Sequence, residues 1–266
     1  MTGKRAFTLI ELLVVIAIIA LLMGIMMPVL SRVKEHARNL LCQANLHQYG
    51  LAERMYLDSN DGFFPSTFDW LFWDAEGRSE LQHLGCQWHN ASIERDGTLW
   101  PYLKDKKIHL CPTFKSFAKQ TGCPNPKHLS RIRVEPQYSY SKNAYLNGDA
   151  SGVVRKEIQV VNPAQVVSFS EENTWTIGDD KSGWSPTDMS YAPLNDNNLL
   201  SRGDRQYHPY APGGGGDCFA TYHNTSPSKR NKGYANAVFV DAHVEQVCAW
   251  NPPDNTFKLL WPKGKK

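Results

Sequence analysis

A single carboxylate, Glu11, lies inside a long apolar run that extends from Phe7 to Leu30. A carboxylate in a membrane-length apolar segment costs roughly a few kcal/mol, so a function and a cationic partner are expected. Cleavage between Ala6 and Phe7 would create that partner, because a free α-amino group titrates at about 8 and is mostly cationic at neutral pH. The new amine would lie about one helical turn from Glu11, in the same subunit or near a staggered neighbour. These residues predict a processing site and an ion pair that exists only after cleavage.

The apolar run is long enough to span a membrane. As a helix, residues 7–30 rise about 1.5 Å per residue, which covers a hydrocarbon core of roughly 30 Å. The alternative is a cleaved secretory signal peptide, which usually has an apolar stretch of about 7 to 15 residues before a small-residue cleavage site. The helical pattern continues past Met23 without such a site, which favours a retained anchor. Lys4 and Arg5 predict a cytoplasmic leader of residues 1–6.

Residues 4–13, Lys-Arg-Ala-Phe-Thr-Leu-Ile-Glu-Leu-Leu, resemble the class III prepilin signal of type IV pilins and of the pseudopilins of type II secretion. The resemblance implies that a prepilin peptidase cuts between Ala6 and Phe7 and methylates the Phe7 amine. It implies that Glu11 is the carboxylate used in filament assembly and that Pro28 kinks the helix. The sequence departs from this family at Ala6, where glycine nearly always precedes the cleaved bond.

The same resemblance implies a location and a set of partners. The chain is expected to cross the inner membrane once, with its head in the periplasm or outside the cell. Besides the peptidase, the implied partners are other pilin-like subunits in a homo- or hetero-filament that serves secretion or adhesion.

Beyond the membrane segment, apolar residues recur at three- and four-residue spacing, which predicts that the helix continues over residues 31–57 as a stalk. We expect this stripe to face the core of the head, with a groove for a partner helix as the alternative. A turn-rich cluster at residues 58–62, followed by Pro65, predicts the end of the helix. The stripe consists of Leu30, Val33, Ala37, Leu40, Leu41, Ala44, Leu51 and Met55.

Residues 58–266 differ in character from the helix. They are rich in Trp, Tyr, Asn, Gly and Pro, with short β-like runs at residues 159–161, 166–170 and 237–240 and no second long amphipathic helix. This length is sufficient for one head with its own core. We therefore expect a pilin-like α+β fold, in which the long N-terminal helix packs on a globular head with an antiparallel sheet.

Two further β-like runs, residues 235–240 and 243–248, flank Asp241 and Ala242 and predict a tight hairpin. Ala242 would need a positive φ in a two-residue turn, at a cost of roughly 1 kcal/mol. A longer turn that includes His243 would avoid this strain.

The hairpin segment also resembles the C-terminal H-X9-DG region of many prepilin-like proteins, with His223 and Asp241 as the equivalent residues. Here 17 residues separate the two, and Ala242 stands where that motif has glycine. No activity is attached to the motif, so we expect His223 and Asp241 to hold the hairpin to the head.

Six cysteines in an oxidising compartment allow up to three disulfides and 15 pairings. We favour Cys42 with Cys111, which would tie the helix to the head, and Cys86 with Cys123. Several buried thiols are the alternative. The sequence has no Cys-x-x-Cys pair, which argues against a zinc ribbon or a thioredoxin-like site.

Net charge and sequence motifs limit which further functions the chain could have. A net charge of +3 over 266 residues gives no indication of a nucleic-acid partner. Signatures of hydrolases, zinc proteases, P-loop proteins and dinucleotide-binding enzymes are missing, so we expect no enzymatic activity and no cofactor. Oxygen ligands for Ca²⁺ are conceivable at Asp179, Asp180 and residues 195–198, but a solvated turn is the simpler explanation.

Two functional hypotheses follow from the sequence. The first is a structural filament subunit. The alternative is a membrane-tethered glycan-binding or enzymatic module delivered by a prepilin signal, since the chain is rich in tryptophans that stack well on sugar rings.

Overall fold

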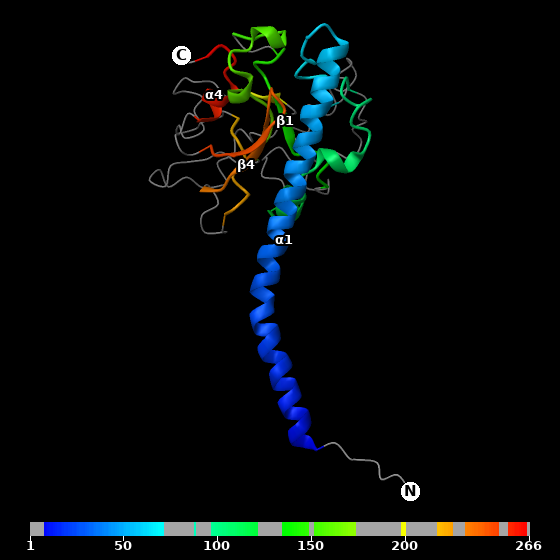
Figure 1. Cartoon of the computed structure of the whole chain (residues 1–266), viewed down its shortest axis with the longest axis vertical. Coiled ribbons are helices and arrows are strands. Elements are labelled where there is room, and N and C mark those ends of the chain that lie inside the picture. Colours follow the sequence, from blue (N-terminus) through cyan, green and yellow to red (C-terminus); the bar gives the residue numbers. More distant parts are fainter. Residues whose placement is uncertain are drawn as a thin grey trace.

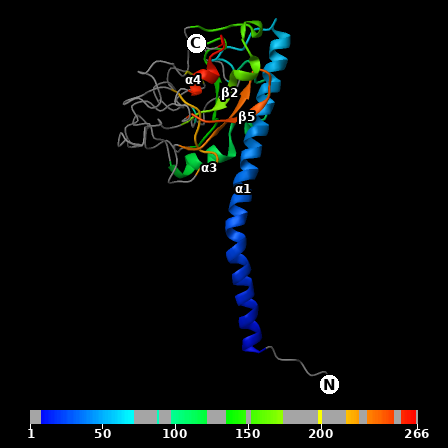
Figure 2. The ribbon, with the colours of Figure 1, turned by 60° about the vertical axis from the view of Figure 1, so that its left-hand side comes forward.

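The computed structural model describes residues 8–71, 88, 97–121, 135–148, 152–173, 198–200, 217–225, 232–249 and 255–264. One helix of 51 residues, α1 (Leu9–Ser59), carries a globular head on its C-terminal part (Figure 1). The N-terminal part of the same helix extends away from the head in both views (Figure 2). Pro28 lies inside α1, and the helix continues through it.

Local signals explain where α1 begins and ends. Thr8 caps the helix by accepting a hydrogen bond from the Glu11 backbone N–H, and the Glu11 carboxylate accepts one from the Thr8 N–H in return. At the other end, the Gly62 N–H donates to the carbonyl of Leu57 over 2.9 Å. Gly62 has a φ of 72°, which suits glycine and turns the chain away from the helix.

The head is built around a five-stranded sheet with the strand order β3-β1-β2-β4-β5. Neighbouring strands pair in antiparallel fashion except β1 and β3, which are parallel, so the sheet is mixed rather than purely antiparallel. The strands are β1 (Tyr140–Asn143), β2 (Val167–Glu171), β3 (Asn198–Leu199), β4 (Ala235–Phe239) and β5 (Val244–Val247). The expected α+β fold with a long N-terminal helix is confirmed.

Short helices complete the described part of the head. They are η2 (Lys106–His109), α3 (Pro112–Thr121), η3 (Glu157–Gln159), η4 (Pro163–Gln165) and α4 (Asn255–Leu260). The strand expected at residues 159–161 is wrong, because η3 ends at Gln159. The Gln159 carboxamide oxygen accepts hydrogen bonds from the backbone N–H groups of Arg155 and Lys156, which favours a helical turn there.

The core of the head lies between α1 and the sheet. Tyr49 of α1 has ring contacts with Trp70, Tyr140 and Phe169, at centroid distances of 5.4, 5.4 and 5.1 Å. All four of these aromatic residues are buried. An aromatic cluster contributed by distant segments therefore holds the upper part of the helix against the sheet.

The apolar stripe of α1 does not face the head, contrary to the sequence-based expectation. Leu40, Leu41 and Met55 are 51, 56 and 55 % exposed. At about 100° per residue, the residues that do face the head lie almost opposite the stripe. They are Asn39, Cys42, Leu46, Tyr49, Gly50, Ala52, Glu53 and Leu57. This other face contacts the head because the head provides specific partners for the side chains of Cys42, Tyr49 and Glu53. The described part of the head does not present a broad aliphatic surface to the helix.

The hairpin formed by β4 and β5 is present, but its turn differs from the expectation. The strands pair up to Val238 and Val244, and the Phe239 N–H donates to the His243 carbonyl over 2.9 Å, so the turn is longer than two residues. Ala242 nevertheless has a φ of 73°. The expectation that a longer turn would relieve Ala242 is therefore wrong.

Candidate functional site

The N-terminal part of α1 is the first candidate site. It contains a segment near the N-terminus that is long and apolar enough to cross a membrane, and none of that segment is buried within the molecule. Residues 1–7, which include Ala6 and Phe7, lie outside the described part of the chain. The structure thus presents an uncovered apolar helix of the kind expected for a membrane anchor.

Glu11 is held at the very start of this helix. Its Oε2 atom accepts hydrogen bonds from the Thr8 backbone N–H over 2.8 Å and from the Thr8 hydroxyl over 2.7 Å. A carboxylate in the first turn is also favoured by the helix dipole. Removal of residues 1–6 would place a new amine on residue 7, next to the N–H group that Glu11 already accepts. The described contacts thus place the Glu11 carboxylate against Thr8, the residue that directly follows Phe7 in the chain.

The second candidate site is the outward face of α1 at the level of the head. Its apolar residues Val33, Leu40, Leu41, Leu51 and Met55 are each about half exposed, between 49 and 58 %. We call these five residues the outer stripe. Single exposed apolar side chains are ordinary, but a row of them on one helix face is typical of a surface that binds another helix.

A buried ion pair joins α1 to the sheet. The Lys142 ammonium of β1 lies 2.5 Å from the Glu53 carboxylate, and the side chains are 0 and 3 % exposed. Ser168 of β2 donates a further hydrogen bond to Glu53. Burial lowers the pKa of Lys142, while the Glu53 charge acts in the opposite direction. Sequence reasoning missed this pair, because nothing near Lys142 in the chain marks it as buried.

A second connection between helix and head is covalent. Cys42 of α1 forms a disulfide with Cys111, which precedes α3. This is the pairing favoured from the sequence. Cys86 and Cys123, the other favoured pair, lie outside the described residues.

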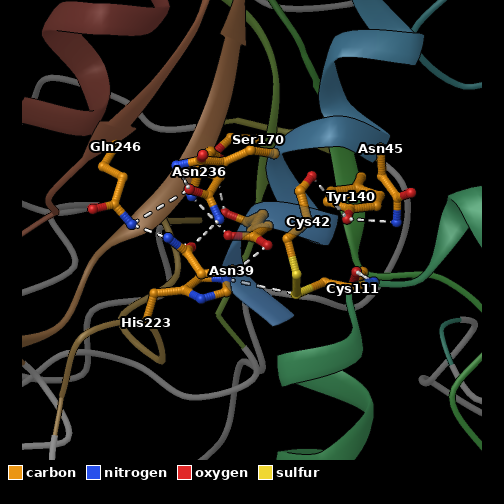
Figure 3. A network of polar contacts seen from close by, with 12 residues as sticks. Asn39, Cys42, Asn45, Cys111, Tyr140, Ser170, His223, Asn236 and Gln246 are labelled. Carbon is orange, nitrogen blue, oxygen red and sulfur yellow. Dashed lines mark hydrogen bonds and ion pairs between the residues drawn. A yellow bond between two sulfur atoms is a disulfide. The ribbon is translucent and has the colours of Figure 1, made fainter. Parts of the chain in front are cut away.

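Two ionisable residues that the sequence did not bring together, His223 and Glu171, lie close to this disulfide. Figure 3 shows His223 beside Cys111. The His223 Nε2 atom is 3.5 Å from the Cys111 sulfur and 2.9 Å from the Glu171 carboxylate. The other oxygen of Glu171 accepts a hydrogen bond from the Asn236 backbone N–H over 2.7 Å. His223, Glu171 and both cysteines are buried. The His223 Nδ1 atom has no hydrogen-bond partner among the residues that the structure describes.

Amides extend this network towards the edge of the sheet (Figure 3). The side chain of Asn236 in β4 donates to the Asn39 carboxamide oxygen of α1 over 3.0 Å, and Gln246 of β5 donates to the same oxygen over 3.3 Å. Gln43 of α1 donates to Asn236 over 3.1 Å. The contact between α1 and the hairpin is therefore polar at this level, which explains why an apolar stripe is not needed there.

His223 and Asp241 have separate surroundings. His223 pairs with Tyr234 through two backbone hydrogen bonds and directs its ring to Glu171 and Cys111. Asp241 lies in the exposed hairpin turn, where its carboxylate is 2.5 Å from the His243 Nδ1 atom. His223 thus connects its own segment to Tyr234, which directly precedes β4, whereas Asp241 has its contact within the turn.

Most of the candidate calcium ligands, Asp179, Asp180 and residues 195–197, lie outside the described residues. Asn198, which the structure does describe, is buried in β3.

Comparison with known proteins identifies one region of the chain. Residues 1–27 match the family model of the prokaryotic N-terminal methylation motif. No curated protein and no solved structure matches the chain. The chain therefore carries a prepilin-type signal, followed by an apolar anchor helix and a pilin-like α+β head.

Proposed function

We propose that this chain is a structural, non-enzymatic subunit of a type IV pilus-like or type II secretion filament. A prepilin peptidase cuts between Ala6 and Phe7 and methylates the new amine. The mature subunit is stored in the inner membrane with its head in the periplasm or outside the cell, and then enters the filament with other pilin-like subunits. The observation that carries this proposal is the outer stripe.

The outer stripe supports assembly because of where it lies. It is on the side of α1 opposite the head, and it follows directly on the uncovered apolar segment from Leu9 to Leu30. Once a subunit leaves the membrane, both apolar surfaces must be covered to avoid contact with water. The head cannot cover them, because it lies on the other side of the C-terminal part of α1 and the N-terminal part extends away from it (Figure 1). Neighbouring copies of α1, packed side by side along their whole length, cover both surfaces together.

Glu11 supports assembly for an electrostatic reason. Its carboxylate lies at the end of the apolar helix, where an unpaired charge in a helix bundle is costly. The amine of a neighbouring mature subunit, or that of its own Phe7, neutralises the carboxylate. The ion pair fixes the axial position of one subunit relative to the next.

Two of the described tryptophans argue against the glycan-binding alternative. Trp70 and Trp88 are buried in the core, where they cannot stack on a sugar ring. Trp100 and Trp261 are partly exposed, but both have ring contacts within the head, Trp100 with His109 and Trp261 with Tyr145 and Phe257. Trp73, Trp175 and Trp184 lie outside the described residues.

A filament-incorporation experiment tests the proposal. Glu11→Ala should leave membrane insertion and cleavage largely intact, because the apolar segment and the cleaved bond are unchanged. The variant should be nearly absent from purified filaments, since its neighbour's amine has no partner. Mass spectrometry of the N-terminus checks processing, with N-methyl-Phe at residue 7 as the expected product.

Two further variants in the same experiment separate the roles. Leu41→Lys places a charge on the outer stripe and should also exclude the subunit from filaments. Glu35→Ala changes an exposed residue on the face of α1 almost opposite the stripe and should assemble normally. Normal amounts of Glu11→Ala and Leu41→Lys in purified filaments would contradict the assembly proposal. An N-terminus that still carries Met1 would contradict the processing step.

A further inference from the structure

Four metal-ligating side chains converge at one buried point between α1 and the head. They are Cys42 from α1, Cys111 before α3, Glu171 at the end of β2, and His223. Their donor atoms all lie within 4.8 Å of one another. A disulfide alone requires no such neighbours. Thiolates, an imidazole nitrogen and a carboxylate oxygen are the ligands that Zn²⁺ prefers in proteins.

The donor atoms lie near enough to one another to converge on one tetrahedral ion after small shifts. With Zn–S distances of about 2.3 Å and Zn–N or Zn–O distances of about 2.0–2.2 Å, two ligand atoms on one zinc are roughly 3.3–3.8 Å apart. The Cys111 sulfur and His223 Nε2 are already 3.5 Å apart. His223 Nε2 and Glu171 Oε1 are 2.9 Å apart and need to separate by only a few tenths of an ångström. The two sulfurs must separate, which reduction of the disulfide permits.

The surroundings orient these ligands as a metal site requires. Glu171 is held through its second oxygen by the Asn236 N–H, which leaves Oε1 directed at His223. Cys111 directly precedes the ten-residue helix α3, and a helix N-terminus stabilises a thiolate. Its backbone N–H donates to the Ser139 hydroxyl over 2.8 Å. Such fixed outer contacts raise metal affinity by holding the ligands in place.

We propose that the reduced protein binds one Zn²⁺ through Cys42, Cys111, His223 and Glu171, so that disulfide and metal are alternative occupants of this point. An external dithiol reduces the disulfide by thiol–disulfide exchange: it gives up two electrons and two protons, becomes a disulfide itself, and leaves Cys42 and Cys111 as two thiols. Zinc then displaces both thiol protons, and the imidazole binds through Nε2 with its proton on Nδ1. Both states tie α1 to the head, one by a covalent bond and the other by the metal. This inference goes beyond the filament proposal and does not depend on it.

Metal titration of the full-length chain in detergent tests this proposal. A trialkylphosphine supplies the two electrons, takes its oxygen from water and leaves as the phosphine oxide, so no added thiol competes for metal. Co²⁺ is the probe, because a tetrahedral site with thiolates gives intense visible bands and a thiolate-to-cobalt absorption. The reduced chain should bind one Co²⁺ at this site and release it to Zn²⁺, whereas the oxidised chain should show no such bands.

Matched variants assign the signal to the cluster. His223→Ala and Cys42→Ser should weaken binding by at least about tenfold, the lower end of the effect of even outer-shell changes. His243→Ala, in the exposed hairpin turn, and Cys248→Ser, outside the cluster, should bind as the unchanged chain does. Equal Co²⁺ spectra in all four variants, or no binding by the reduced chain, would overturn the proposal.

X-ray absorption of the unaltered, reduced, zinc-loaded chain keeps the test independent of whether a variant folds. Two sulfur and two nitrogen or oxygen neighbours are expected around the zinc. A sulfur-free shell, or one with three or four sulfurs, assigns the metal to other residues and refutes the site.

Discussion

Gly50 lies where α1 meets the β4–β5 hairpin, and it lacks a side chain for a steric reason. A Cβ atom at this position would lie 2.8 Å from Val238 Cγ2 and 3.1 Å from Ala242 Cβ. Gly50→Ala gains about 1 kcal/mol of helix propensity but forces the hairpin outward. Overpacking of this kind costs roughly 1–3 kcal/mol. We expect a net loss of stability, seen as a lower melting temperature by tryptophan fluorescence in detergent.

Gly24 provides the control for Gly50, because it is in the same helix and a Cβ there would meet nothing within 4 Å. Gly24→Ala should leave the melting of the head unchanged. A melting temperature for Gly50→Ala at or above that of Gly24→Ala would show that the hairpin does not press on α1.

At the scale of elements, the Glu53–Lys142 pair connects α1 to β1 at a point without solvent. Loss of one partner leaves a buried charge uncompensated, which costs roughly 3–5 kcal/mol. Glu53→Leu and Lys142→Met should each destabilise the head by about this amount. The double variant should recover most of the loss, because two apolar side chains can pack together. Denaturant unfolding of the four chains gives the coupling energy.

An ion pair nearer the surface, between α1 and η3, serves as the comparison. Arg54 and Glu157 are 2.6 Å apart, but their side chains are 38 and 28 % exposed. Glu157→Gln should therefore cost no more than about 1 kcal/mol. If the effects of Glu53→Leu and Lys142→Met are additive in the double variant, the two side chains are not coupled. If Glu157→Gln costs as much as either of them, burial does not make the Glu53–Lys142 pair more important for stability.

Features that depend on neighbouring residues could be predicted from the sequence, whereas most of those that depend on distant residues could not. The helix α1, the hairpin and the signal around Glu11 depend on neighbouring residues, so period, caps and turn residues predict them. The face that α1 turns to the head depends on partners far away in the chain, such as Lys142, 89 residues from Glu53. Aliphatic periodicity therefore indicated the wrong face. Cys42 and Cys111 could be paired from the sequence, but only the sheet brings Glu171 beside His223.

At the scale of the whole molecule, two buried tyrosines link stability to alkaline pH. Burial raises the pKa of Tyr140 and Tyr222 well above the ordinary value of 10.0, and the charge of Glu171 acts in the same direction. Above this value the unfolded chain loses protons that the folded chain keeps, so stability falls as pH rises. Burial lowers the pKa of Lys142 from 10.5, which makes stability rise with pH below that value. Because two tyrosines oppose one lysine, the fall outweighs the rise once the unfolded tyrosines begin to ionise, so we expect the net decline to begin near pH 10.

Titration of phenolate absorbance measures this linkage directly. The unfolded chain should ionise all 11 of its tyrosines near pH 10, whereas Tyr140 and Tyr222 should stay protonated in the folded chain until the head unfolds. Tyr222→Phe should therefore lower the phenolate count of the unfolded chain by one and leave that of the folded chain unchanged. The same variant should lose less stability per pH unit in alkali, because one fewer group binds protons differently in the two states. A lower phenolate count in the folded variant would mean that Tyr222 already ionises in the native head, and the linkage would then have to originate elsewhere.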